Sequence, residues 1–166
     1  LAVRAMYGRP LEDPEAWDEI PDPGFPHPDT GDAAEAAERN RRQWPGPFPP
    51  LFDHLDLRPA VGVLPWEPEW EPGAPARYAR WARWRVPPVG ADGALDPLSL
   101  LPLADLPAPS LWVRYGPDRP MRALLSLEMA VEVLAPALDE WVLCDFRSRH
   151  LSEGYLQVDA ELFSAG

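Results

Sequence analysis

Proline is the residue that most constrains how this chain can fold. The chain contains 24 prolines in 166 residues, and ten of them lie between Pro10 and Pro50, with acidic residues in between. Proline fixes φ near about −65° and lacks a backbone N–H donor, so this stretch cannot form the interior of a sheet. We therefore expect residues 8–50 to be an extended linker that contains one short helix over residues 32–42.

Composition and charge exclude several classes of protein. Hydrophobic residues make up 46% of the chain, which is enough for a packed core. The net charge of −12 argues against nucleic-acid binding, which needs a basic surface. No apolar run approaches the ~20 residues of a membrane span, and no signal sequence is visible. All 15 basic residues are arginine, as in GC-rich bacterial genomes. We expect a cytoplasmic bacterial protein.

The cysteine and histidine content predicts neither a metal site nor a cofactor. The single cysteine, Cys144, excludes an internal disulfide framework, and its apolar neighbours indicate a core residue rather than a nucleophile. The three histidines, His27, His54 and His150, are scattered without metal-ligand spacing.

From residue 51 onward the pattern changes to that of a folded domain. Five segments predict strands, because they alternate apolar and polar residues or are rich in aromatic residues; they are residues 52–58, 77–86, 122–134, 140–150 and 154–163. The connections between the last three are short, so we expect these strands to pair antiparallel.

Residues 96–105 give the strongest helix signal. Asp96 can cap the first turn, and Pro97 occupies the first helical position, where its missing N–H is harmless. Leucines occupy nearly all faces of this helix, which predicts that it is buried, and Pro107 and Pro109 should end it. The expected fold is α+β: a curved antiparallel sheet wrapped around a buried helix.

Four phrases, in this order, carry a resemblance to a known family: Phe52-Asp-His-Leu-Asp-Leu-Arg-Pro59, Asp96-Pro-Leu-Ser-Leu-Leu-Pro-Leu-Ala-Asp105, Leu125-Ser-Leu-Glu-Met-Ala-Val131, and Glu140-Trp-Val-Leu143 running on to Gly154-Tyr155. Their order and spacing resemble the second half of a thioesterase-like double hot-dog protein of the acyl-CoA thioesterase II group.

The resemblance implies both chemistry and site residues. The family hydrolyses acyl-CoA to a free fatty acid and CoA, using an Asp, a Thr or Ser, and a Gln to position the attacking water. Asp105 matches the aspartate late in the central helix, and Ser126 matches the hydroxyl residue in the following strand. The glutamine lies in a final strand that would follow Gly166, and Gln157 is not its equivalent by register.

The residues alone leave the role of this pair open. Asp105 is the one charged residue in the apolar stretch 98–106, and burial there would favour a base that orients water. An aspartate at the end of a helix is also a common turn former, and Ser126 could be a small packing residue. Because CoA is polyanionic and the chain is acidic, a CoA site would depend on local arginines such as Arg80, Arg83 or Arg147.

The resemblance also implies a domain organisation. Residues 1–7 would be the end strand of a preceding hot dog, residues 8–50 the linker, and residues 51–166 an incomplete C-terminal hot dog without its last strand. We expect such a fragment to be inactive alone and to form a homo-oligomer or pair with the missing half. Its partner would be acyl-CoA or another acyl thioester.

Two alternatives to an enzyme remain. The chain could be a non-catalytic hot-dog module that binds acyl chains or serves as the structural half of a double hot dog. The proline-rich stretch by itself would suggest an interaction protein, but the alternating strands after residue 51 count against that reading.

Overall fold

The computed structural model describes residues 24–29, 31–44, 49–106, 109–116 and 125–164. The predicted strand over residues 1–7 and the first part of the predicted linker lie outside these ranges. The predicted domain boundaries therefore stay predictions.

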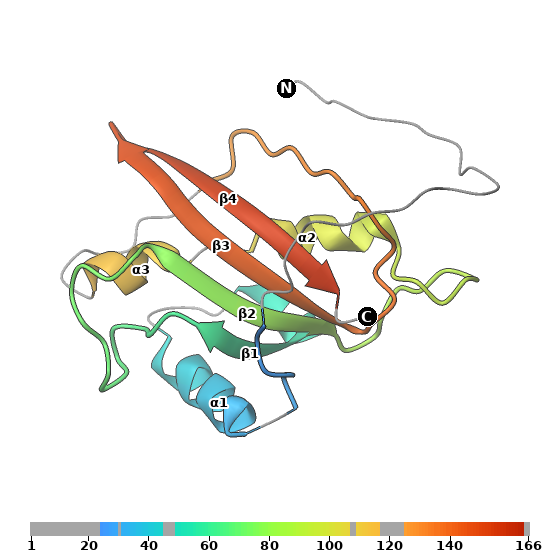
Figure 1. The fold of residues 1–166 in the computed structure, drawn as a ribbon, viewed down its shortest axis with the longest axis horizontal. Coiled ribbons are helices and arrows are strands. Elements are labelled where there is room, and N and C mark those ends of the chain that lie inside the picture. Colours follow the sequence, from blue (N-terminus) through green and yellow to red (C-terminus); the bar gives the residue numbers. More distant parts are fainter. Residues whose placement is uncertain (1–23, 30, 45–48, 107–108, 117–124, 165–166) are drawn as a thin grey trace.

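One antiparallel sheet organises the described residues (Figure 1). Its strands lie in the order β1 (Leu55–Val61), β2 (Arg77–Trp84), β3 (Trp141–Ser152) and β4 (Tyr155–Ser164). Glu153 and Gly154 join β3 to β4, and both have positive φ, at 52° and 86°. Two such residues give the tight hairpin turn whose twist matches that of the strands.

The predicted strands over residues 77–86, 140–150 and 154–163 are confirmed as β2, β3 and β4. The first predicted strand begins later than expected, because residues Pro50–His54 form a 3-10 helix, η1, ahead of it. It also continues through Pro59, where the register with β2 shifts. Proline is tolerated there because β1 is an edge strand of this sheet.

The strand predicted over residues 122–134 is wrong for its described part, since residues 125–134 contain no strand. Leu125 and Leu127, on the face predicted to be apolar, are 82% and 73% exposed, and Ser126 and Glu128 on the other face are exposed too. An alternating sequence forms a strand only where a neighbouring strand supplies hydrogen-bond partners and a packed layer buries its apolar face.

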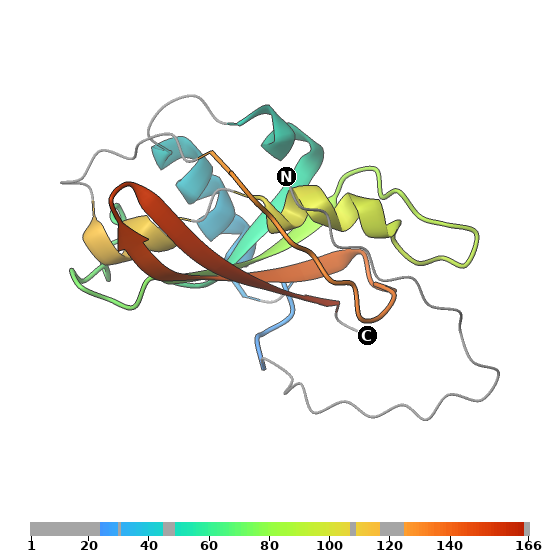
Figure 2. The same ribbon diagram turned by 90° about the horizontal axis from the view of Figure 1, so that it is seen from above.

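The helices are short and lie on one side of the sheet (Figure 2). They are α1 (Ala33–Gln43), η2 (Pro97–Ser99), α2 (Leu100–Ala104) and α3 (Ser110–Tyr115). The predicted helices over residues 32–42 and 96–105 are confirmed by α1 and by η2 with α2. As predicted, Asp96 caps η2, accepting a hydrogen bond from the Leu98 N–H at 2.9 Å. The sequence did not predict α3, which begins directly after Pro109.

The main core lies between α2 and the sheet. Leu100, Leu103 and Leu106 pack in one cluster with the β3 residues Val142 and Phe146. The burial of this helix is one-sided, however, because Leu98 is 71% exposed. The prediction that the helix is buried on nearly all faces is therefore wrong for its first turn. An open four-stranded antiparallel sheet with helices on one face is α+β and compatible with a hot dog.

The opposite face of the sheet carries a second, smaller core. Trp81, Trp141 and Leu143 form its centre, and Phe25 packs against them from the segment before α1. The Trp81 indole N–H donates to the Pro26 carbonyl at 3.1 Å, which fastens this segment to the sheet. Among the described residues, no helix is long and apolar enough to cross a bilayer.

Candidate active site

Asp105 stands at the C-terminal cap of α2. Its backbone N–H donates to the Leu101 carbonyl, so the helix itself fixes its backbone. Leu103 and Leu106, on either side of it, are buried at 0% and 2% exposure. These two leucines hold the end of the helix against the sheet and thereby fix the place of the carboxylate.

Ser126 lies in the extended segment that follows the undescribed residues 117–124. Its hydroxyl Oγ donates a hydrogen bond to Oδ1 of Asp105. The structure therefore brings together the two residues that the sequence singled out, although they are 21 positions apart. They meet through a loop, and not through the predicted strand.

Both side chains of this pair are exposed. The burial that would have favoured a base role for Asp105 is therefore absent. Each residue of an α-helix turns by about 100°, so Asp105 is about 200° from the sheet-facing Leu103 and points away from the core. A base role for Asp105 cannot rest on its desolvation.

Further carboxylate and amide side chains of the domain are exposed as well. Glu128 and Glu132, which follow Ser126 in the same segment, are exposed. Gln157 is an exposed residue of β4, opposite His150 of β3. The glutamine of the family's catalytic trio was not matched to any of the residues that the structure describes.

The family model for the acyl-CoA thioesterase C-terminal domain matches residues 14–166 of this chain. The chain belongs to this family. Comparisons with curated proteins and with solved structures gave no match. The predicted thioesterase-like resemblance is confirmed, and with it a thioesterase-type function in general terms.

Of the three arginines suggested for CoA in this thioesterase domain, one is buried and two are paired with carboxylates. Arg80 is buried, at 3% exposure. Arg83 pairs with Asp56 at 3.0 Å, and Arg147 pairs with Asp145 at 2.8 Å. A CoA site built on Arg83 or Arg147 would have to compete with these ion pairs.

The cysteine of the thioesterase domain is a core residue, as predicted. Cys144 is fully buried, and burial raises the pKa of its thiol to about 12. A thiol with such a pKa is not the thiolate that nucleophilic catalysis needs. Within the described ranges, no group of three or more His, Cys, Asp or Glu side chains is arranged to hold a metal ion.

Sequence reasoning missed two buried charged groups of the thioesterase domain. Asp145 is 1% exposed and accepts hydrogen bonds from Arg77 at 2.8–3.2 Å on one face of the sheet. Arg80 is buried on the other face, beside a cavity. The sequence of β2 could have revealed the burial of Arg80, since successive side chains of a strand alternate between its two faces. This alternation places Arg80 on the same face of the sheet as Tyr78 and Ala82.

Proposed function

We propose that this chain is part of an acyl-CoA thioesterase that hydrolyses acyl-CoA to a free fatty acid and CoA. The hydrogen bond between Ser126 and Asp105 carries the proposal, since it joins the two residues matched to the family's site. The family match over residues 14–166 supports the reaction class.

Asp105 would act on the attacking water. A carboxylate has two oxygens, so accepting the Ser126 hydroxyl at Oδ1 leaves Oδ2 to accept a hydrogen bond from water. The water oxygen then bonds to the thioester carbonyl carbon, one of its protons passes toward the carboxylate, and the carbon–sulfur bond breaks. The CoA sulfur leaves and takes a proton, which gives CoA thiol and the acid.

Ser126 would hold the carboxylate in the orientation that this step requires. Holding a catalytic group in one geometry accounts for a large share of enzymatic rate enhancement. The exposure of the pair fits a site that another part of the protein covers, as the family resemblance implies for a double hot dog.

The same exposure favours a second candidate function. A solvated carboxylate is a weak base, so the chain could be a non-catalytic hot-dog half that binds acyl chains or supports the other half. The two candidates differ in one measurable respect, which is whether Asp105 is needed for turnover.

The test is acyl-CoA hydrolysis by the intact gene product, followed by the release of CoA thiol across a series of acyl chain lengths. Asp105→Asn should lower kcat by about 100-fold or more, because it removes the group that accepts the proton. Glu128→Gln is the matched control, an exposed carboxylate two residues after Ser126, and should leave turnover unchanged. Unchanged turnover in Asp105→Asn, with the parent active, would exclude the assignment.

A further inference from the structure

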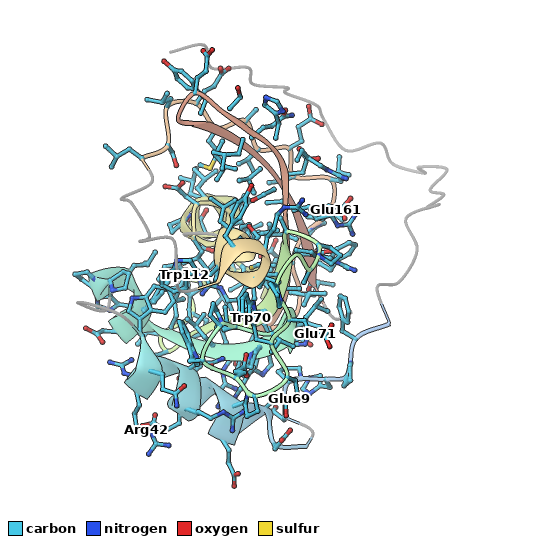
Figure 3. All side chains as sticks on the ribbon, turned by 90° about the vertical axis from the view of Figure 1, so that its left-hand side faces the viewer. Arg42, Glu69, Trp70, Glu71, Trp112 and Glu161 are labelled. Atoms are coloured by element: carbon cyan, nitrogen blue, oxygen red, sulfur yellow. The ribbon has the colours of Figure 1, made fainter. Side chains whose placement is uncertain are left out.

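A cavity of about 250 Å³ lies between α1, η1 and the first two strands of the sheet. Its apolar wall includes Trp44, Phe52 and Leu57, and its polar wall includes Asn40 and Arg80. Neither Asp105 nor Ser126 lines it. Figure 3 shows α1 beside the sheet, with Arg42 on the outer side of the helix, while Asn40 is buried.

Arg80 is the buried charged group among the residues that line this cavity. Its Nε and Nη2 atoms are buried and have no hydrogen-bond partner among the described residues. Its guanidinium lies 5.0 Å from the ring centre of Phe52 and 5.9 Å from that of Tyr78, so aromatic faces are its neighbours. Burial lowers the pKa of Arg80, which reflects the free-energy cost of a desolvated cation.

Asn40 contributes a second unused donor. Its Oδ1 accepts a hydrogen bond from the Trp66 indole at 3.0 Å, and this contact fixes which end of the amide is the nitrogen. The Nδ2 atom is buried and has no partner among the described residues. The polar wall therefore offers N–H donors from two elements without matching acceptors.

The carboxylates at the rim do not supply these acceptors. Asp56 also lines the cavity, but its oxygens accept from Arg83 at 3.0 Å and from Arg85 at 3.2 Å. Glu38 lies on an exposed position of α1. A buried guanidinium is normally paired, so the arrangement leaves room for an anion from outside the described chain.

We propose that this cavity binds a small carboxylic acid with a short apolar chain. The carboxylate is an acceptor-only group that matches the free donors of Arg80 and Asn40. The apolar chain would lie against Trp44, Phe52 and Leu57. The volume is below the ~300–1,000 Å³ of sites for drug-sized ligands, which suits a chain of a few carbons. This site is separate from the proposed thioesterase site and does not depend on it.

The direct test is calorimetric titration of the 166-residue chain with three probes. Hexanoate should bind saturably, whereas 1-hexanol, which has the chain without the charge, and inorganic phosphate, which has the charge without the chain, should bind about tenfold more weakly or worse. Hexanol binding as tightly as hexanoate would overturn the role of Arg80. Phosphate binding as tightly would overturn the role of the apolar wall.

A pair of variants on β2 locates the site. Arg80→Met keeps the length of the side chain and should weaken hexanoate binding about tenfold or more. Arg83→Met is the matched control, because Arg83 lies on the same strand but pairs with Asp56, and it should bind hexanoate like the parent. Hexanoate binding that survives Arg80→Met, or that is lost equally in Arg83→Met, would overturn the proposal. The probe comparison needs no substitution and decides the question even if a variant fails to fold.

Discussion

Ser126 donates its hydroxyl hydrogen bond to Asp105, and this contact joins the extended segment after residue 124 to the end of α2. The backbone of Asp105 is fixed by the helix, whereas residues 125–134 belong to no strand or helix. The carboxylate thus depends on α2 for its position and accepts the Ser126 hydroxyl at one of its two oxygens.

The hydroxyl of Ser126, rather than its size, should matter for turnover. In the intact gene product, Ser126→Ala should lower kcat/KM for acyl-CoA by about tenfold or more, because the carboxylate loses a hydrogen-bond donor. Ser126→Thr keeps the hydroxyl and should retain most of the activity. Steady-state kinetics across both variants checks this. Equal activity of the Ala and Thr variants would contradict a positioning role.

Asp145 should dominate the response of the fold to acid. Burial by itself raises the pKa of Asp145, but hydrogen bonds from Arg77 and Arg147 outweigh burial and lower it. A carboxylate whose pKa is lower in the folded state stabilises the protein fully above its unfolded value of about 3.9. That contribution is lost as the pH falls through the folded pKa. Urea unfolding between pH 7 and pH 2 should show this loss.

The substitution Asp145→Asn should remove most of that pH dependence. It should also lower the free energy of unfolding at pH 7 by about 2–4 kcal/mol, because two guanidinium groups lose a buried partner that is 1% exposed. Asp159→Asn is the control, since its pair with Arg149 is exposed and should contribute less than about 1 kcal/mol. Equal losses in the two variants would contradict the special role of Asp145.

Gly116 should tolerate no side chain. It ends α3 with φ 68° and ψ −164°, a conformation that is essentially restricted to glycine. A Cβ there would lie 2.4 Å from the ring of Trp70, whose indole N–H donates to the Val113 carbonyl. Gly116→Ala should therefore lower the free energy of unfolding by about 2–4 kcal/mol and change the tryptophan fluorescence.

The control for this prediction is Gly154→Ala in the hairpin turn. Gly154 also has positive φ, at 86°, but a Cβ there would meet nothing within 4 Å. That variant should lose only about 1 kcal/mol, from backbone strain alone. Chemical denaturation of both variants separates the steric effect from the backbone effect, and similar losses would refute the proposed clash.

The 166-residue chain should self-associate in solution. Four leucines of the segment 125–138 are 68–82% exposed, and they are Leu125, Leu127, Leu134 and Leu138. The strand β4 is an edge of the described sheet. Exposed apolar side chains and an open edge both promote association. Light scattering should show a mass that rises with concentration, and Leu127→Glu should reduce it. A monodisperse monomer of the parent chain would contradict the prediction.

Local features of the fold could be predicted from the sequence because neighbouring residues decide them. Asp96 and Pro97 indicated the start of a helix, since capping and a fixed φ act within one turn. Alternation and aromatic content indicated β2, β3 and β4, and short connections indicated antiparallel pairing. The same local phrases carried the resemblance that the family match confirmed.

The tertiary structure decided what depends on distant neighbours. The sequence of residues 125–134 alternates like a strand, yet no strand forms there, because a strand needs hydrogen-bond partners that the segment cannot supply. Asp105 is exposed because the packing of Leu103 fixes the rotation of α2. Arg80 is buried because its face of the sheet is covered by helices far away in the sequence. The sequence by itself determined most of the helices and strands and the family, and packing between distant elements determined which charges are hidden and which meet.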